Sequence, residues 1–261
     1  MAAHALITGA SGLVGSWVLH HWGDDTGTTP LPVRHADVDL LVPGSAAELV
    51  ARTEPTQVVH LAWSASGRTD YRTTDDNDRW VDATLELVEA ARAAGAGVWL
   101  TGTAVDDEAD ASDAYARSKA RLRTSVRSDI EQGTLGWLRP YYVFDEQRRR
   151  PAVVDLATGA RERGETLHLR SPHQAHDFVH ASDVGRAIVT AVARDLRGEI
   201  QIGSGRLHTV AELVTRLGAD WSADPDPGAP APTHTDQTAD TTRLTRSGWA
   251  PTRTEELFDH G

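Results

Sequence analysis

The chain contains no cysteine in its 261 residues. Disulfide bonds, thiolate zinc sites and a cysteine nucleophile are therefore excluded together. No apolar run approaches the length that a membrane-spanning helix needs, and the first residues lack the basic-then-apolar pattern of a secretory signal. We therefore expect a cytoplasmic protein with no membrane partner.

Basic residues are also scarce. The chain has 26 lysines and arginines against 38 acids, which gives a formal net charge of −12. This balance argues against nucleic-acid binding, because phosphate contacts need clustered basic side chains. The twelve histidines include two close pairs, His20 with His21 and His173 with His176, and neither has helical metal-ligand spacing with a third ligand nearby. We therefore predict no metal site.

The segment ALITGASGLVG occupies residues 5–15. Its apolar start predicts a buried parallel strand, followed by a glycine turn and a helix that begins near Leu13. Gly9 would allow the tight turn, Gly12 would admit a pyrophosphate close to the backbone, and Gly15 would let the helix lie near the sheet. A glycine triplet alone can mark a loop that needs positive φ. The flanking strand and helix favour dinucleotide binding, with the phosphates at the helix N-terminus.

Strands and helices alternate through the first half of the chain, which predicts an α/β fold with a doubly wound parallel sheet. We expect strands at residues 5–7, 31–34, 57–62, 97–101 and 135–138, and helices at 45–53, 78–94 and 114–132. Ser45 is the expected N-cap of its helix. Beyond Phe144 the pattern changes to short helices and strands.

The second predicted strand ends at Arg34 and His35. Many NAD enzymes have an acidic residue at this point, which binds the ribose 2′-hydroxyl. An arginine suits a 2′-phosphate instead, so the sequence favours NADP over NAD, although an exposed loop arginine is the competing interpretation. Asp39 follows and is placed to touch the adenine edge.

Tyr115 and Lys119 lie four residues apart in a predicted helix and therefore share one face. An ammonium stabilises a nearby phenolate, so we expect Lys119 to lower the pKa of Tyr115. Thr103 follows the preceding strand, at the same sheet edge as the glycine turn. A tyrosine acid, a lysine that holds the nicotinamide ribose and a threonine that orients a carbonyl make a complete site for hydride transfer. The competing interpretation of the Tyr–Lys pair is a solvated helix face.

Together these motifs resemble the extended short-chain dehydrogenase/reductases of the nucleotide-sugar epimerase/dehydratase type. Other segments that match the family are VVHLA at 58–62, the turn at 102–103, LRP at 138–140, HDFVHASD at 176–183, IGSG at 202–205 and RLTRSGWAP at 243–251. The resemblance implies a Rossmann-like NAD(P)-binding domain at residues 1–143, to which 178–203 return. It also implies a small C-terminal substrate-binding lobe at 144–177 and 204–261, and a homodimer formed through the helix of Tyr115 and the helix before it.

The resemblance also implies roles for individual residues. Catalysis falls to Thr103, Tyr115 and Lys119. The expected cofactor contacts are Gly9, Ser11, Gly12, Leu13, Val14, Gly15, Arg34, Asp39, Leu40, Leu61, Ala62, Trp63, Thr101, Tyr115, Lys119, Pro140 and Tyr142. The substrate candidates are Thr103, Tyr71, Tyr141, Arg148, Arg149, Arg150 and His176. The three consecutive arginines suit a diphosphate, and a solvated charge run explains them equally well.

Departures from the family pattern narrow the reaction. Ala104 and Val105 stand where sugar 4,6-dehydratases carry an Asp-Glu pair, which disfavours dehydration. Residues 33–41 resemble the NADPH-dependent 4-ketoreductases and GDP-fucose synthases, but the epimerising cysteine of the latter would fall at Val105. Trp80 replaces the asparagine expected four residues before Thr84.

The sequence therefore predicts an NAD(P)H-dependent reductase whose small-molecule substrate is a nucleotide-linked 4-keto-6-deoxyhexose, in the biosynthesis of a glycosylated secondary metabolite. Three alternatives stay open. They are an epimerase that holds NAD⁺ tightly, a reductase of a carbonyl substrate without a nucleotide, and an NAD(P)-sensing protein without catalysis. Sensing proteins on this fold commonly lose the tyrosine or the lysine, and this chain keeps both.

Overall fold

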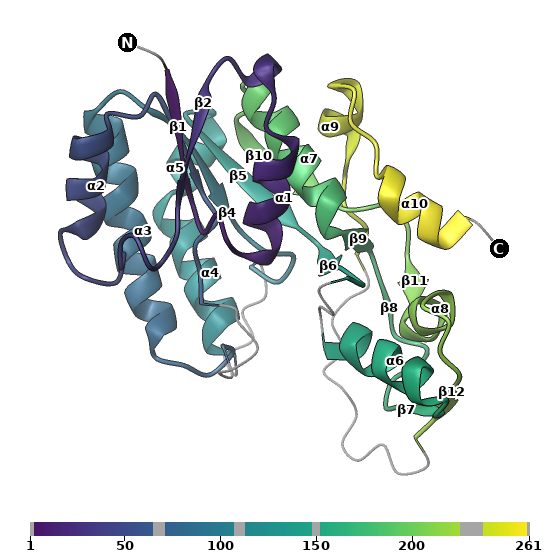
Figure 1. Ribbon diagram of the computed structural model, residues 1–261. Helices are drawn as coiled ribbons and strands as arrows, with labels where there is room; N and C mark the ends of the chain where they lie inside the picture. The colour runs from purple at the N-terminus through teal and green to yellow at the C-terminus, as the bar shows by residue number, and fades with distance from the viewer. Residues whose placement is uncertain (1–2, 65–70, 107–112, 148–151, 225–236, 260–261) are drawn as a thin grey trace. The chain divides into compact units, whose positions relative to one another are not determined.

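The computed structural model describes residues 3–64, 71–106, 113–147, 152–224 and 237–259 (Figure 1). The chain forms two compact units, one of residues 1–139 and 188–200 and the other of residues 140–187 and 201–261. None of the described helices is both long and apolar enough to cross a bilayer.

The first unit is built on a six-stranded sheet with the strand order β10-β5-β4-β3-β1-β2 (Figure 1). The strands are β1 His4–Thr8, β2 Thr29–Val33, β3 Gln57–His60, β4 Gly97–Thr101, β5 Leu135–Pro140 and β10 Gly198–Ile202. Neighbouring strands from β2 to β5 pair in parallel. Because β1 lies between β2 and β3, the strand order reverses there, and ligands of such sheets bind at the carboxyl ends of the strands beside this reversal. The predicted Rossmann-like sheet is confirmed.

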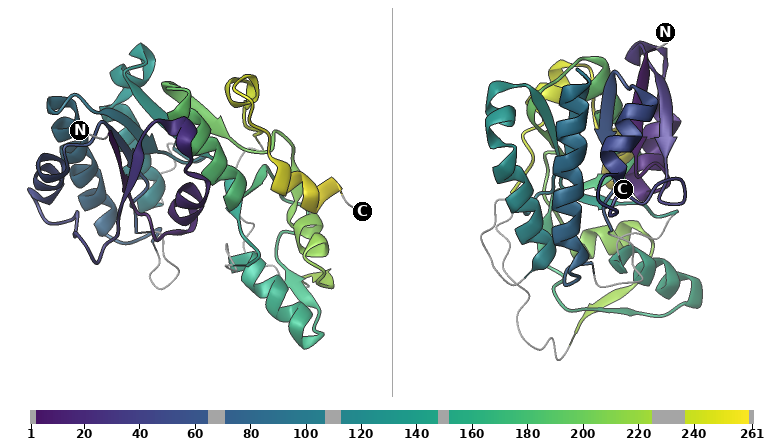
Figure 2. Two further views of the ribbon diagram at one scale, coloured as in Figure 1. Left: turned by 45° about the horizontal axis from the view of Figure 1, so that its top comes forward. Right: turned by 90° about the vertical axis from the view of Figure 1, so that its left-hand side faces the viewer.

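Helices cover both faces of this sheet. They are α1 Leu13–His21, η1 Asp24–Thr26, α2 Ser45–Thr53, α3 Asp76–Ala93, α4 Ala114–Ser125 and α5 Arg127–Gln132. Helices α2, α3 and α4 lie side by side on one face, with α1 across the sheet from them (Figure 2). Leu6, Val58 and Leu100 point from the sheet into a core shared with Leu87 of α3 and Leu122 of α4. This packing fixes α4, and its side chains, against the carboxyl end of β4.

Two local predictions are wrong. Ser45 is the first residue of α2 and not its N-cap, which is Gly44 at φ +87°. The carboxylate of Glu86, on α3, accepts the N–H of Gly44 and so supplies the cap from a distant part of the chain. The predicted helix 114–132 is interrupted at Val126, where φ is −107°, and forms α4 and α5.

The second unit is a small mixed lobe. It contains three two-stranded sheets, β6 Tyr142–Phe144 with β9 Phe178–His180, β8 Ala175–His176 with β11 His208–Thr209, and β7 Leu167–Leu169 with β12 Trp221–Ala223. Its helices are α6 Ala152–Arg163, α7 Ala181–Ala193, α8 Val210–Arg216, α9 Thr242–Arg246 and α10 Thr252–Asp259, and α7 continues into the first unit. Phe144, Phe178, Leu213 and Phe258 lie in one core. The predicted small C-terminal lobe is present.

Residues 178–187 belong to the second unit, whereas the sequence-based division assigns them to the Rossmann domain. Two contacts explain their place. Phe178 pairs with Tyr142 between β9 and β6. Asp183 accepts hydrogen bonds from both the backbone N–H and the hydroxyl of Thr254, each at 2.7 Å. The predicted boundaries of the functional domains stay a prediction.

Candidate active site

The glycine turn joins β1 to α1. Gly9 has φ +70°, and its carbonyl accepts the N–H of Gly12 at 2.9 Å. A Cβ on Gly15 would overlap the carbonyl oxygen of Gly9, so the turn and the helix are in direct backbone contact. A Cβ on Gly9 itself would come within 2.6 Å of the backbone nitrogen of Ala62, which follows β3. The turn is therefore packed between α1 and the segment after β3.

These features fit a dinucleotide. Gly12 is the N-cap of α1 and carries no side chain, so the first N–H groups of the helix face outward without a side-chain cap. A Cβ at this position would lie 3.1 Å from the carbonyl oxygen of Gly9 and fill the approach. Ser11 is exposed in the turn, while Leu13 and Val14 are partly buried and open the helix. An anion such as a pyrophosphate suits this helix terminus.

The residues expected at the adenosine end lie after β2. Arg34 pairs with Asp37, with 3.0 Å between Nε and Oδ2 and 3.3 Å between Nη2 and Oδ1. The hydrogen bonds between them raise the pKa of Arg34 and lower that of Asp37, and both side chains are exposed. Asp39 accepts the N–H of Leu41 at 3.0 Å, and Leu40 is buried in the core of the first unit.

The three predicted catalytic residues meet at the carboxyl end of β4. The phenol of Tyr115 lies beside the side chain of Thr103, near enough for that hydroxyl to lower the pKa of the phenol. Lys119 Nζ donates to the carbonyl oxygen of Thr101, the last residue of β4, at 2.8 Å. Helix α4 starts at this point because Asp113 caps it, its Oδ1 accepting the N–H of Tyr115 at 2.9 Å.

The expected effect of Lys119 on Tyr115 is not found. The pKa of Tyr115 is raised, first by burial of the phenol and then by the neighbouring phenol of Tyr71, while the hydrogen bond with Thr103 lowers it. Desolvation outweighs the attraction of a nearby ammonium, because a phenolate is much harder to bury than a phenol. Tyr115 therefore holds its proton at neutral pH.

Lys119 is the only lysine in the chain and is almost fully buried. Its Nζ lies 3.6 Å from the centroid of the Trp63 ring, which is close cation–π geometry. Burial lowers the pKa of Lys119 to about 7, against the attraction of Asp106. The amine therefore donates to the carbonyl of Thr101 and lies against the face of the Trp63 indole.

Aromatic side chains pack around Lys119 and Tyr115. Trp63 donates from Nε1 to Oδ1 of Asn77 at 2.8 Å and stacks on Trp80 with 6.1 Å between ring centroids. The ring of Tyr71 meets the Tyr115 ring edge-on at 5.1 Å. Trp80, which departs from the family pattern, and Asn77, one turn earlier on α3, thus both contact Trp63 and hold it over the lysine.

A buried histidine underlies the site. His60, at the end of β3, lies 2.7 Å from the hydroxyl of Thr8 and 3.0 Å from that of Thr84. Thr84 donates its own proton to the carbonyl of Trp80, so its oxygen accepts from Nε2 of His60 and leaves Nδ1 to accept from Thr8. Burial lowers the pKa of His60 to about 3, so the ring is neutral and ties β1, β3 and α3 together.

Asp106 and Arg139 were not assigned a role from the sequence, and both are buried beside Thr103. Asp106 accepts the N–H of Thr103, and Arg139 donates to its carbonyl. An arginine inside an otherwise apolar strand was the available signal, because a buried guanidinium needs an acidic partner.

The remaining sequence candidates belong to the second unit. Pro140 ends β5, and Tyr141 is buried and donates to Oε1 of Gln201 at 3.0 Å. Tyr142 stacks on His176 with 3.8 Å between ring centroids. Arg148, Arg149 and Arg150 lie outside the described residues.

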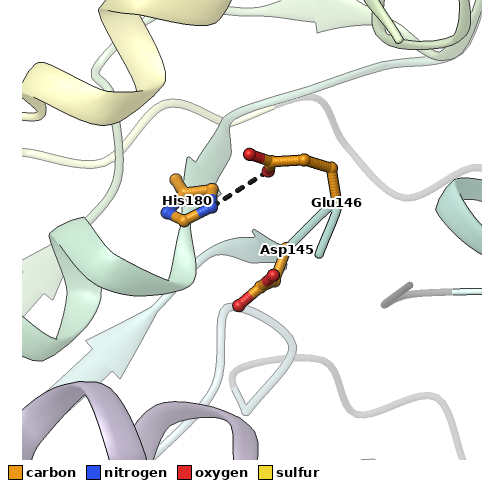
Figure 3. A group of neighbouring side chains, drawn as sticks. All are labelled: Asp145, Glu146 and His180. Carbon is orange, nitrogen blue, oxygen red and sulfur yellow. Dashed lines mark ion pairs between the residues drawn. The ribbon is translucent and has the colours of Figure 1, made fainter. Parts of the chain in front are cut away.

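One group in the second unit has the composition of a metal site, Asp145, Glu146 and His180 (Figure 3). Nδ1 of His180 accepts the backbone N–H of Ser182 at 3.0 Å, so the ring proton lies on Nε2, 3.0 Å from Glu146. A protonated Nε2 cannot ligate a metal. The second oxygen of Glu146 pairs with Arg253, and the contact with His180 is the main cause that lowers the pKa of Glu146 to about 2. Glu146 therefore forms an ion pair with Arg253 and lies against the His180 ring.

The buried amine of Lys119 should make stability depend on pH. The pKa is about 7 in the folded chain and about 10.4 in an unfolded one. Between these values the unfolded state binds the proton that the native state has released, so the free energy of unfolding rises with pH, by up to about 1.4 kcal/mol per unit. Urea unfolding from about pH 7.5 to 9.5 should show this rise, and Lys119→Met should lack it.

The pKa of Lys119 can also be measured directly. Because the chain has a single lysine, NMR of isotope-labelled lysine gives one side-chain signal. A midpoint at the value of free lysine would contradict the prediction.

The sheet, the glycine turn and the three polar side chains at its carboxyl edge define a nucleotide-binding protein of the Rossmann type. Residues 5–203 match the model of the NAD dependent epimerase/dehydratase family, and the chain belongs to this family. It is therefore an enzyme of the extended short-chain dehydrogenase/reductase type.

Solved structures share the fold across the whole chain. UDP-glucose 4-epimerase from Thermus thermophilus, in complex with NAD, is 22% identical with a TM-score of 0.71, over 95% of this chain and 94% of that one. UDP-glucose 4-epimerase from Thermotoga maritima, with UDP-glucose, is 18% identical with a TM-score of 0.75, over 95% and 93%. A dTDP-4-dehydrorhamnose reductase from Clostridium acetobutylicum is 14% identical with a TM-score of 0.73, over 98% of both chains. No curated protein matches the chain in sequence.

Proposed function

We propose that the protein reduces a keto-sugar with NAD(P)H, and that its substrate is a nucleotide-linked 4-keto-6-deoxyhexose of deoxysugar biosynthesis. The observation that supports this most directly is the position of the Tyr115 phenol beside Thr103 at the carboxyl edge of the sheet, with Lys119 one turn along the same helix. The expected catalytic roles of these three residues are part of the proposal.

The protonation state of Tyr115 favours reduction over oxidation. When bound, the reduced nicotinamide supplies a hydride to the carbonyl carbon. Tyr115 gives its phenolic proton to the carbonyl oxygen, which completes the alcohol, and its raised pKa keeps that proton available at neutral pH. Thr103 would donate its hydroxyl proton in a hydrogen bond to the phenolate that remains and so stabilise it. An oxidation would need the phenolate first, which burial opposes.

The residues beside Thr103 support a simple reduction. Ala104 and Val105 offer no carboxyl group for the elimination of water. The chain also has no cysteine to remove a proton from a sugar carbon. Reduction of a ketone needs only one acid, which Tyr115 provides.

The test is an assay of NADPH and NADH oxidation with dTDP-, GDP- and UDP-linked 4-keto-6-deoxyhexoses, and with simple ketones for comparison. We expect turnover of a nucleotide-linked sugar. If only simple ketones were turned over, the proposed nucleotide-sugar substrate would be wrong and the protein would be a reductase of carbonyl compounds without a nucleotide. Tight cofactor binding with no turnover of any carbonyl compound would overturn the function.

A second candidate is an NAD-dependent nucleotide-sugar epimerase. It is favoured by the matched family and by the similarity to structures described as UDP-glucose 4-epimerases. An epimerase regenerates its cofactor, so it would retain NAD⁺ through purification and convert a UDP-sugar without net oxidation of NADPH. That pair of results would displace the reductase proposal.

The preference for NADP forms part of the proposal and depends on Arg34. Its ion pair with Asp37 is exposed and therefore weak, so a 2′-phosphate can take over the guanidinium. Arg34→Ala should weaken NADPH binding by about 10-fold or more and leave NADH nearly unchanged, because a charged hydrogen-bond partner is lost. Asp37→Asn should strengthen NADPH binding, since a carboxylate beside the phosphate is removed. Dissociation constants for both cofactors provide the measurement, and an equal loss for NADPH and NADH in Arg34→Ala would contradict it.

We also propose a homodimer that forms through α3 and α4, which lie side by side on one face of the first unit (Figure 2). The support is the resemblance to the family, whose members usually associate through these two helices. Light scattering after size exclusion measures the state, and a monomer at all concentrations would contradict it.

A further inference from the structure

We propose that Arg139 and Asp106 are positioning residues, which hold the side chain of Thr103 beside the phenol of Tyr115. The inference rests on the proposed function, in which Tyr115 is the acid. It concerns this chain's own buried charges, and neither residue contacts the reacting groups directly.

The contacts on Thr103 come from both sides of its backbone. Its N–H donates to Oδ2 of Asp106 at 3.0 Å, and its carbonyl accepts from Nε of Arg139 at 3.0 Å. The same guanidinium donates from Nη2 to the carbonyl of Ala104 at 2.9 Å. One buried pair of side chains therefore fixes both peptide groups of Thr103 just beyond the end of β4.

The pair belongs to a larger cluster of charges, in which Asp106 and Arg139 are buried and Arg123 and Glu199 are partly exposed. Oδ1 of Asp106 lies 3.0 Å from Nε of Arg139 and 3.6 Å from Nη1 of Arg123. Glu199, on β10, pairs with both arginines. Trp137 donates from Nε1 to Oδ2 of Asp106 at 3.1 Å. The charges of the two arginines thus balance those of Asp106 and Glu199. Such pairing offsets the cost of removing charged groups from water.

This arrangement determines where the Thr103 side chain points. Residues beyond a strand end have no ladder partner for their N–H and carbonyl, and such groups normally take water or turn bonds. At Thr103 these two groups bond to the buried side chains of Asp106 and Arg139. The bonds fix the backbone dihedral angles of Thr103 and therefore the direction of its Cβ. The hydroxyl is then held beside the Tyr115 phenol, where its hydrogen bond lowers the pKa of that group. A small displacement of such a group costs far more in rate than in binding.

Arg139→Lys tests the proposal, because lysine keeps the positive charge beside Asp106 but lacks the planar fork whose Nε and Nη2 donate to the carbonyls of Thr103 and Ala104. We expect kcat for keto-sugar reduction to fall by about 10- to 100-fold, with KM for the cofactor unchanged. If Arg139 acts through Thr103, then Thr103→Ala with Arg139→Lys is no slower than Thr103→Ala alone. Additive losses in the double variant would overturn the proposal.

Arg197→Lys is the matched control. Arg197 also lies in the first unit, stacks on Trp99 at 3.8 Å and donates to the carbonyl of Val98, at the opposite end of β4 from Thr103. The Arg197→Lys variant should have a lower thermal stability than the wild type and an unchanged kcat. If Arg139→Lys fails to fold, Glu199→Gln weakens the same cluster at its half-exposed end and should lower kcat in the same direction. An unchanged kcat in that folded variant would also overturn the proposal.

A second measurement does not depend on turnover. The chain has four tyrosines, so NMR of tyrosine labelled at Cζ can assign the Tyr115 signal with Tyr115→Phe. Thr103→Val removes its hydrogen-bond partner and should shift this signal, and Arg139→Lys should shift it the same way while Arg197→Lys should not. If the wild-type protein reduces no carbonyl substrate but the signal shifts as expected, the proposed function fails and the positioning role stands. If the protein turns over and neither kcat nor the signal responds to Arg139→Lys, the positioning role fails.

Discussion

Replacing Tyr115 by phenylalanine should lower kcat for keto-sugar reduction by about 10³-fold or more. Among the described residues of the candidate site, the phenol of Tyr115 combines a partly buried position, a proton held at neutral pH and a place beside Thr103. Thr103 cannot take over, because an aliphatic hydroxyl is a much weaker acid. The nearby amine of Lys119 is held by Thr101 and covered by Trp63, so it is not free to replace the phenol.

The matched comparison is Tyr71→Phe. It deletes the neighbouring phenol, whose ring meets Tyr115 edge-on, and leaves the hydroxyl of Tyr115 in place. Its kcat should fall by at most about 10-fold, with any larger effect in KM, as expected of a residue that binds and does not donate a proton. Cofactor affinity should be unchanged in Tyr115→Phe. A Tyr115→Phe enzyme with wild-type turnover would show that another group is the acid.

The parts of the site that could be predicted are those set by local spacing. Gly9, Gly12 and Gly15 define the geometry of the turn, because the strand and the helix that it joins are adjacent in sequence. Tyr115 and Lys119 share a helix face because they are four residues apart. Thr103 joins them because parallel strands end at one edge of the sheet.

The parts that could not be predicted depend on residues far apart in sequence. The sign of the pKa shift of Tyr115 follows from burial, which no spacing reveals. Glu86 caps α2 from 42 residues beyond Gly44, and Ser45 is displaced from that role. The same holds for Asp106 and Arg139, whose meeting requires β4 and β5 to be neighbours. Sequence patterns supplied the candidate reacting groups, and the folded structure was needed to see what holds them.

Gly9→Ala should have the largest effect on cofactor binding and on stability together. At φ +70° a side chain costs about 1–2 kcal/mol. The new Cβ would also lie 2.6 Å from the backbone nitrogen of Ala62, and backbone atoms cannot swing aside as a flexible side chain can. With the added overlap we expect the free energy of unfolding to fall by about 3–5 kcal/mol. Because the turn must separate from the segment after β3, both NADPH and NADH should bind more than about 10-fold more weakly.

Gly27→Ala separates these two causes. Gly27 has nearly the same backbone angle, φ +67°, but a Cβ there meets no atom within 4 Å. It should therefore cost only the backbone strain, about 1–2 kcal/mol, and leave both cofactor dissociation constants unchanged. Urea unfolding and cofactor titration of the two variants provide the comparison. Equal losses of stability and of affinity in Gly9→Ala and Gly27→Ala would contradict this explanation. Position 9 would then not require glycine because of its close packing against Ala62, and the turn would bind the dinucleotide through some other feature of its backbone.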